Sequence, residues 1–148
     1  MKDIYNYLYY NEKLSSSGMP TPDQLKSVAE AGVQVVINLA TSKSEGAMPN
    51  EGELVNGLGM EYVHIPVEWD KPTHDDLDAF LKAMDEHKGK SILVHCQANY
   101  RASGFVALYR VLKLGWERDE AFQGMQKIWS PDEYPAWDIL IEEKLPPE

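Results

Sequence analysis

The stretch LVHCQANYRAS, residues 93–103, leads from an apolar run into an apolar helical segment without a glycine between them. Residues 91–94 predict a buried strand, because a short apolar run bounded by polar residues is typical of one. Cys96, the only cysteine of the chain, follows this strand, and Arg101 lies five positions further on. The loop between the strand and the helix is therefore the candidate functional site.

This loop has the composition of an anion-binding turn. Backbone N–H groups at a helix start, with the positive end of the helix dipole, form a seat for a dianion. Arg101 can add a guanidinium fork, and the same positive surroundings favour a nucleophilic thiolate at Cys96. Asn99 is well suited to left-handed backbone geometry. The alternative is that Cys96 is only a small buried residue at a strand end, which is common for cysteine.

Strands and helices alternate along the rest of the chain. A first strand or strand pair is predicted within residues 5–14, followed by strands at 33–40, 61–67 and 91–95. Helix starts are predicted at Thr21, Asn50, Thr73 and Arg101, and two further helices near 116–129 and 132–144, the second interrupted by Pro135. This order implies parallel strands joined by right-handed crossovers. We therefore expect an α/β fold of three layers, with a mostly parallel central sheet of four to five strands flanked by helices.

In a parallel sheet, the loops that follow the strands meet at one edge and build the site there. Asp70 follows the predicted strand 61–67 at this edge, beside Trp69, which would lower the local dielectric. A phosphate ester needs a proton on its leaving oxygen, and Asp70 is our candidate for the general acid. The competing carboxylates are Glu68, Asp75 and Asp76. Of these, the last two fall in the first turn of a predicted helix, where capping carboxylates normally lie.

Composition limits the partners of the chain. Its 148 residues, 43% apolar and 26% charged, fit a single domain over residues 1–148. The net charge of −10 argues against nucleic acid or an anionic membrane as a partner, yet allows a small phosphate pocket. One cysteine, no signal-peptide pattern and no membrane-length apolar run indicate a cytoplasmic protein. The four histidines lack metal-ligand spacing, so neither a metal nor another cofactor is expected.

The pair His95-Cys96 followed by Arg101 resembles the active-site motif of cysteine-dependent protein tyrosine phosphatases, and is most similar to the small dual-specificity type. Residues 17–25, SGMPTPDQL, are similar to the segment SGxPTPxQL of a bacterial branch of phosphatase-like proteins. Relatives of that branch occur joined to β-lactamase-like hydrolase domains. Asp70 lies 26 residues ahead of Cys96, where the family carries its general acid.

The resemblance implies a metal-independent phosphatase that hydrolyses phosphate monoesters through a phosphocysteine on Cys96. Phosphotyrosine peptides or small aryl phosphates are the expected substrates, because an acidic surface disfavours polyanions. Asp70 would protonate the leaving group. The groups implied to hold the phosphoryl oxygens are the Arg101 guanidinium and the backbone N–H groups of Gln97, Ala98, Asn99, Tyr100 and Arg101. His95 either tunes the thiolate or is a hydrogen-bonded core histidine, and we favour a supporting role.

The loop departs from the usual family motif in two ways. Four residues separate Cys96 from Arg101 instead of five, a shortening that the bacterial branch shares. Ala102 stands where the family has serine or threonine, but Ser103 keeps the usual distance of seven from Cys96 and is expected to help the thiolate leave. The short loop also suits a rhodanese-like sulfurtransferase with a persulfide on Cys96. A third reading is a phosphate-binding module without turnover.

Overall fold

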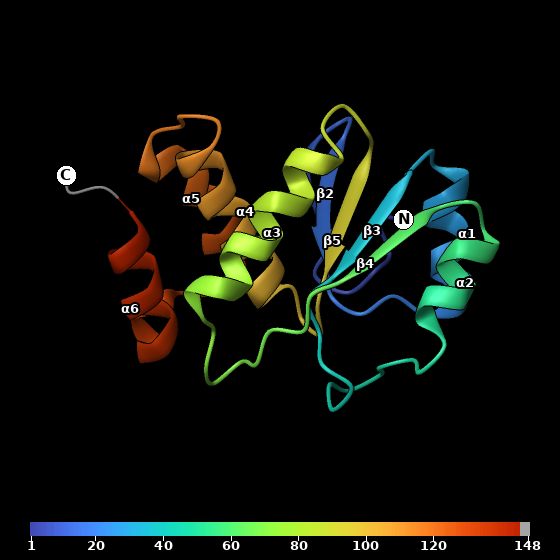
Figure 1. Cartoon of the computed structure of the whole chain (residues 1–148), viewed down its shortest axis with the longest axis horizontal. Coiled ribbons are helices and arrows are strands. Elements are labelled where there is room, and N and C mark those ends of the chain that lie inside the picture. The colour runs from blue at the N-terminus through green and yellow to red at the C-terminus, as the bar shows by residue number, and fades with distance from the viewer. Residues whose placement is uncertain (146–148) are drawn as a thin grey trace.

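The computed structural model describes residues 1–145 as a central sheet between layers of helices (Figure 1). The last three residues of the predicted domain lie outside this range. The five strands have the order β1-β2-β5-β3-β4. They are β1 Leu8–Asn11, β2 Leu14–Ser17, β3 Val35–Asn38, β4 Glu61–His64 and β5 Ile92–His95. Every pairing is parallel except the β1–β2 hairpin, so the expected α/β fold with a mostly parallel sheet is confirmed.

Helices cover both faces of the sheet (Figure 1). One face carries α1 Pro22–Glu30 and α2 Glu51–Gly57, and the other carries α3 His74–Glu86 and α4 Tyr100–Leu112. Beyond α3 and α4 lie α5 Arg118–Gln126, the 3₁₀ turn η1 Pro131–Glu133 and α6 Pro135–Lys144. No helix within residues 1–145 is both long and apolar enough to cross a bilayer.

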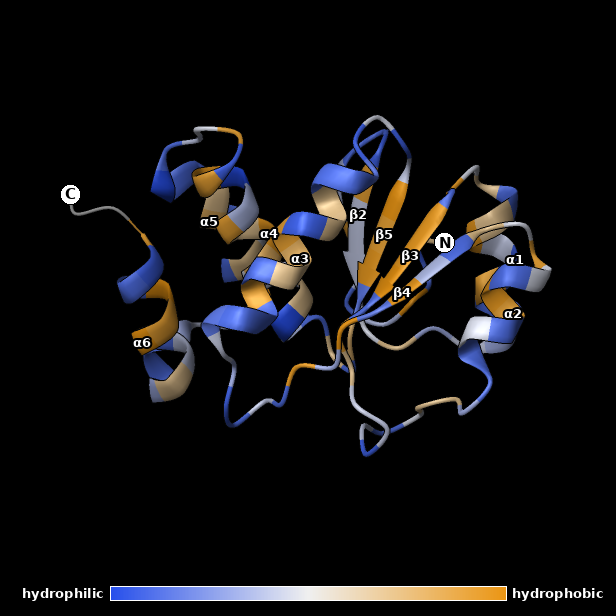
Figure 2. Ribbon diagram, in the orientation of Figure 1, coloured by the Kyte–Doolittle hydropathy of each residue, from blue (hydrophilic) through white to orange (hydrophobic). Residues whose placement is uncertain are grey.

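The inner strands are apolar on both sides because helices bury both sides (Figure 2). Val36 of β3 and Leu93 of β5 pack in the cluster with α1 and α2, while Ile37 and Val94 pack in the cluster with α3 and α4. Alternate residues of one strand therefore serve two separate core layers, and the loops after the strands are left to build the site.

Strand β2 was only partly predicted. The sequence places strand structure within residues 5–14, whereas β2 continues through three serines to Ser17, and all of its residues are buried. Serine has a low strand preference, but β2 pairs in parallel with β5 and its hydroxyls have partners. Ser16 Oγ lies 2.7 Å from the Tyr10 hydroxyl, and Ser17 Oγ donates to the Gly18 carbonyl oxygen. Pairing in the sheet overrides the local preference here.

The predicted helix boundaries are confirmed at two capping boxes and wrong at one proline. Thr21 with Gln24 caps α1, and Thr73 with Asp76 caps α3. Pro135, which we expected to interrupt a helix over 132–144, is the first residue of α6. A proline is tolerated there because the first N–H groups of a helix have no intrahelical partner.

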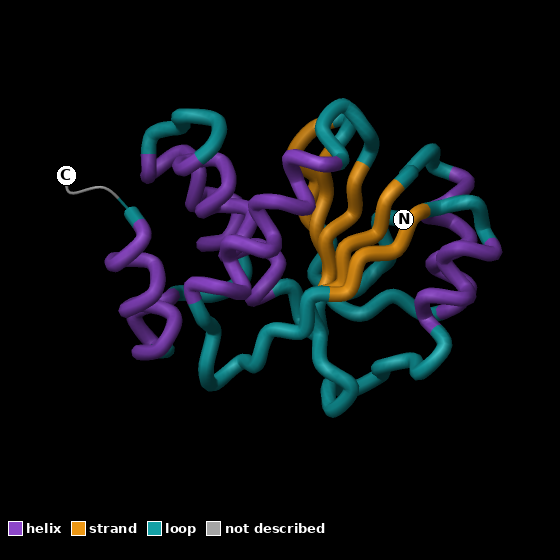
Figure 3. Tube along the Cα trace, viewed as in Figure 1, coloured by secondary structure: helices purple, strands orange, loops and turns teal. Residues whose placement is uncertain are grey.

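The loops that follow β3, β4 and β5 gather at one edge of the sheet, the lower edge in Figure 3. The loop after β5 carries Cys96, the loop after β4 carries Asp70, and the loop after β3 runs through residues 39–50. This is the arrangement expected of parallel strands, and it brings three distant segments of sequence to one place.

Candidate active site

Residues 96–101, here called the cysteine loop, connect the end of β5 at His95 with the first turn of α4. Cys96 is completely buried as a residue, and its side chain lines a pocket of about 320 Å³. The Cys96 backbone N–H donates to the Ser17 carbonyl oxygen over 3.3 Å, which ties the loop to the end of β2. Cys96 thus belongs to the wall of a pocket and is shielded from bulk water.

The carbonyl groups of the cysteine loop point outward into hydrogen bonds. The Gln97 carbonyl oxygen accepts from the Met19 N–H at 3.0 Å, and the Ala98 carbonyl oxygen accepts from Asn6 Nδ2 at 3.0 Å. Within residues 1–145, the backbone N–H groups of Gln97, Ala98, Tyr100 and Arg101 donate no backbone hydrogen bond. A loop whose carbonyl oxygens already accept hydrogen bonds, and whose N–H groups still lack acceptors, is suited to bind an oxyanion.

Two residues explain how so short a loop turns. Asn99 has a φ of +68°, so the predicted left-handed residue is confirmed, and its Nδ2 donates to the Asn6 carbonyl oxygen at 2.7 Å. Gly18 lies directly behind the loop, where a Cβ atom would come within 2.8 Å of the Gln97 carbonyl oxygen. The segment that begins at Ser17 therefore supports the loop by close backbone contact, which only glycine permits at this position.

Arg101 is 6% exposed and is held by neutral groups. Its Nη1 donates to the Val67 carbonyl oxygen at 2.8 Å, and Nη2 donates to Ser44 Oγ at 3.5 Å. These two partners come from the loops after β4 and β3, so all three loops contact one another through the guanidinium. Because neither partner is a carboxylate, the charge of Arg101 remains available to an anion in the pocket.

The pocket beside Cys96 has aromatic walls. Trp69 and Tyr134 line it together with Tyr100 of the cysteine loop. Trp69 stacks on Trp137 at 5.3 Å between ring centroids and meets Tyr134 edge-on at 4.9 Å. Burial in this ring cluster, more than the neighbouring Tyr134, raises the pKa of Tyr100. The Tyr100 phenol therefore stays uncharged at neutral pH.

Asp70 lies at the same edge, in an adjoining and more open pocket of about 640 Å³. The two pockets share Trp69, Gln97 and Arg101, so the structure brings Asp70 and the cysteine loop to the walls of one hollow. The Trp69 carbonyl oxygen accepts from Trp137 Nε1 at 2.9 Å, which anchors the segment that carries Asp70. Among the competing carboxylates, Glu68 lines the same pocket, whereas Asp76 accepts hydrogen bonds as part of the cap of α3.

Ser103 was expected to help the thiolate leave, and that role stays a prediction. Its hydroxyl donates to the Asn99 carbonyl oxygen at 2.6 Å and accepts from Trp129 Nε1 at 3.0 Å. Within residues 1–145 it makes no hydrogen bond with Cys96 Sγ. The hydroxyl thus fastens the start of α4 to the loop, and Ala102 beside it is fully buried.

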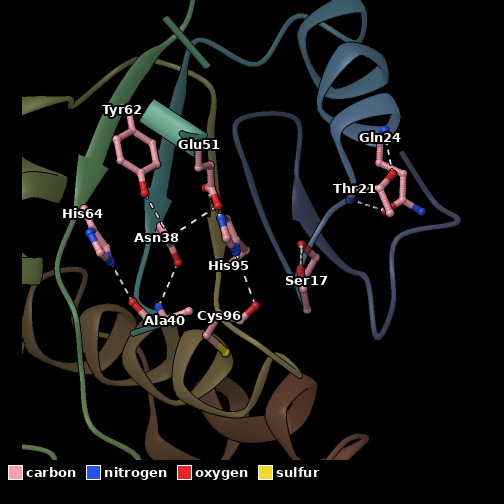
Figure 4. Close-up of polar contacts among 11 residues, drawn as sticks. Ser17, Thr21, Gln24, Asn38, Ala40, Glu51, Tyr62, His64, His95 and Cys96 are labelled. Atoms are coloured by element: carbon pink, nitrogen blue, oxygen red, sulfur yellow. Dashed lines mark hydrogen bonds and ion pairs between the residues drawn. The ribbon is translucent and has the colours of Figure 1, made fainter. Parts of the chain in front are cut away.

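The sequence did not reveal one member of the site, Glu51. His95 points away from the pocket, and its Nε2 lies 2.6 Å from Glu51 Oε2, while Nδ1 lies 3.3 Å from the Cys96 carbonyl oxygen (Figure 4). Glu51 is 2% exposed and His95 is 0% exposed. The only signal in the sequence was an acidic residue at a predicted helix start, which is ordinary for a helix first turn.

The comparisons with known proteins agree with this geometry. Residues 10–132 match the family model described as "DSP-PTPase phosphatase fused to NAD+ Kinase", so the chain belongs to this family of dual-specificity-type phosphatases. A curated relative, the β-lactamase hydrolase-like protein of Xylella fastidiosa strain Temecula1, is 34% identical over 113 residues. That match covers 74% of this chain but 26% of the relative, so the chain spans about a quarter of its length.

Two solved structures show the same fold. A DUF442 protein of Shewanella putrefaciens, named as a candidate phosphatase, is 44% identical, covers 97% of this chain and 90% of its own, and has a TM-score of 0.88. P. aeruginosa TpbA, solved in complex with phosphotyrosine, is 17% identical with a TM-score of 0.71, over 90% of this chain and 81% of its own. The second likeness concerns the fold alone.

Proposed function

We propose that this protein is a metal-independent phosphatase that hydrolyses phosphate monoesters through a phosphocysteine on Cys96. The observation that carries the proposal is the cysteine loop itself. Within residues 1–145, loop N–H groups without an acceptor and a guanidinium without a carboxylate partner line the same pocket as Cys96. The family match supports phosphatase chemistry in general, and the loop geometry supports this particular form of it.

In the first step, the Cys96 thiolate attacks phosphorus and displaces the alkoxide or phenoxide of the ester. Asp70 gives its proton to that leaving oxygen, so a neutral alcohol or phenol departs. Arg101 and the loop N–H groups stabilise the charge on the three non-bridging oxygens. In the second step, Asp70 takes a proton from water, and the hydroxide attacks phosphorus. The thiolate leaves, and inorganic phosphate is released.

The aromatic walls favour aryl phosphates and phosphotyrosine peptides as substrates. A phenyl ring attached to a phosphate in the cysteine loop would lie against Trp69 and Tyr134. Rings at such contacts contribute about 0.5–1.5 kcal/mol beyond the burial of apolar area. The net charge of −10 adds a general repulsion against polyanions. We also propose a cytoplasmic location, where the single cysteine stays reduced.

The decisive experiment measures hydrolysis of p-nitrophenyl phosphate in the presence of a chelator, for wild type and Cys96→Ser. We expect wild-type activity that survives the chelator and is lost in the variant, while the variant still binds phosphate or vanadate. Rapid denaturation during turnover of a ³²P-labelled substrate should trap label on the wild-type protein alone, and this label should be labile in acid and stable in alkali, as a thiophosphate is. The absence of turnover in the wild type would contradict the proposal.

The same proteins separate the remaining alternatives. A sulfurtransferase would transfer sulfur from thiosulfate to cyanide through Cys96 and would be indifferent to substitution of Asp70. A phosphate-binding module would bind phosphate equally well in both proteins and turn over neither substrate. Arg101→Lys adds a further check, because lysine keeps the charge and loses the bidentate fork that a phosphoryl group needs.

A further inference from the structure

Glu51 is the first residue of α2, on the side of the sheet opposite to α4. An acidic residue at this position normally faces water and complements the helix dipole. Glu51 instead turns inward and reaches His95 over the end of β3, as Figure 4 shows. A buried carboxylate is unfavourable unless a partner compensates its charge, so this contact needs a reason.

The hydrogen bonds of His95 determine how many protons the pair carries. The Cys96 carbonyl oxygen can only accept, so Nδ1 must carry a proton in order to bond with it. The 2.6 Å contact between Nε2 and Glu51 Oε2 requires a second proton between these two atoms. The pair therefore holds two protons, as an imidazolium facing a carboxylate does, and it buries no net charge.

We propose that Glu51 is a positioning residue of the active site: its carboxylate keeps His95 doubly protonated and oriented so that Nδ1 holds the Cys96 carbonyl group. The inference rests on the proposed function and extends it to a residue that lies outside the substrate pocket. The positive ring of His95 is next to Cys96 in the chain, whereas the carboxylate lies on the far side of the ring. This order of charges favours the thiolate form of Cys96.

The surroundings of Glu51 fix its side chain. Asn38 Nδ2 donates to Glu51 Oε1 at 3.5 Å and to the Tyr62 hydroxyl at 3.0 Å, and Asn38 Oδ1 accepts from the Ala40 N–H at 2.8 Å. The titratable group that faces the pair from a neighbouring strand is Tyr62 of β4. Burial, followed by the charge of Glu51, raises the pKa of Tyr62, so this phenol stays neutral. Within residues 1–145 no lysine or arginine forms an ion pair with Glu51.

The first test compares Glu51→Gln with Glu53→Gln. Both variants remove one negative charge from α2, but Glu53 is exposed and serves as the matched control. Cys96 is the only cysteine, so the pH dependence of its alkylation by iodoacetamide reports its ionisation without any turnover. Glu51→Gln should slow alkylation about tenfold at a fixed pH near neutrality, because the thiolate form of Cys96 is less favoured. Glu53→Gln should stay within about twofold of wild type.

The second test reads the protonation of the His95 ring directly. In ¹⁵N NMR spectra of the wild type, both ring nitrogens of His95 should be protonated at neutral pH, and Glu51→Gln should convert the ring to a form with one proton. A singly protonated ring in the wild type, or unchanged alkylation in a folded Glu51→Gln protein, would overturn the inference. Cysteine alkylation and the NMR signals of His95 can both be measured on a protein without phosphatase activity. A failure of the proposed function is therefore distinguishable from a failure of the inference about Glu51.

Discussion

Asp70 is exposed, while Trp69 directly before it is packed among four other aromatic rings. This arrangement anchors the ring and leaves the neighbouring carboxylate exposed to solvent, as the proposed role of general acid requires. The proposed role of Asp70 can therefore be tested, because an amide of the same shape can replace the carboxylate without disturbing the packing of Trp69.

Asp70→Asn should lower kcat by about 10²–10⁴-fold for phenyl phosphate, whose leaving group needs a proton. The loss should be much smaller for an ester with a strongly acidic phenol as its leaving group. Steady-state kinetics with a series of aryl phosphates measures this difference as a steeper dependence on leaving-group pKa. Glu68→Gln is the control in the same loop. If kcat falls in this variant and not in Asp70→Asn, Glu68 is the general acid.

Tyr134 lies beyond the residues that match the family model, yet it forms one wall of the pocket at Cys96. Tyr134→Ala should raise KM for aryl phosphates by about 2–10-fold, because one ring contact is lost, and should leave KM for alkyl phosphates little changed. Tyr134→Phe should restore the wild-type value. Tyr9→Ala, at an exposed tyrosine of β1, is the control. Equal effects on aryl and alkyl esters would show that Tyr134 is structural.

At the scale of single residues, the sequence was informative where only a few residue types can adopt the required backbone conformation. Asn99 was predicted to be left-handed because few other residues adopt that geometry easily, and it does so. Ser103 has many possible partners, and spacing alone could not show that its hydroxyl binds the loop backbone. Glu51 was hidden because the contact with His95 spans 44 positions and depends on how α2 lies over the sheet.

Among the elements, the contact between the end of β2 and the cysteine loop is the most sensitive to a small change. Gly18→Ala would press a methyl group against the Gln97 carbonyl oxygen and the Tyr5 side chain. We expect a loss of about 1–3 kcal/mol in the free energy of unfolding, with a larger loss of phosphate binding as the loop shifts. Urea unfolding and vanadate titration measure the two effects.

Gly57→Ala is the matched control for this substitution. It lies in α2, where a Cβ atom would meet nothing within 4 Å, so alanine should be neutral or stabilise the protein by up to about 1 kcal/mol. If Gly18→Ala were as stable as Gly57→Ala and bound vanadate normally, the close contact behind the loop would not matter for the site.

The elements that were misjudged share a physical cause. Strand β2 is polar in sequence, and only its neighbours in the sheet make three buried serines acceptable. Pro135 was taken as a helix breaker because a proline inside a helix removes a hydrogen bond, but at the first position of α6 there is none to remove. The local sequence pattern contains neither the strand that pairs with β2 nor the residue at which α6 begins, so neither feature could be predicted from it.

For the molecule as a whole, the order of strands and helices was sufficient to predict the layered sheet and the edge at which the loops with Asp70 and Cys96 gather. The alternation of apolar runs with amphipathic segments leaves few topologies once crossovers are right-handed. The position of β2 next to β5 was not predictable, because a parallel neighbour can be drawn from any earlier strand. That position matters, since β2 supplies the Ser17 carbonyl group that binds the Cys96 N–H.

The fold should also lose stability at alkaline pH through its buried phenols. Desolvation raises the pKa of Tyr10 from 10.0 to about 12, although hydrogen bonding to Ser16 and the charge of Arg110 act in the opposite direction. A raised pKa means that the contribution to stability is fully present below pH 10 and is lost as pH rises through about 12. Unfolding free energies from urea titrations should therefore fall more steeply across this window in wild type than in Tyr10→Phe.

Tyr9→Phe is the control, because Tyr9 is exposed on the same strand. It should keep the wild-type slope, whereas Tyr10→Phe should be less stable at neutral pH, where its hydrogen bond with Ser16 is missing, and flatter above pH 10. Equal slopes in all three proteins would show that Tyr10 does not ionise in this window.

Three of the four tryptophans, Trp69, Trp129 and Trp137, meet in one cluster, and Trp116 lies apart against Arg110. Three of the four indoles therefore report on how the segment that carries Asp70 packs against the cysteine loop. Any oxyanion that draws this segment inward should shift the indole emission. The chain thus contains its own optical reporter, and occupancy and closure could be followed in stopped flow without a label.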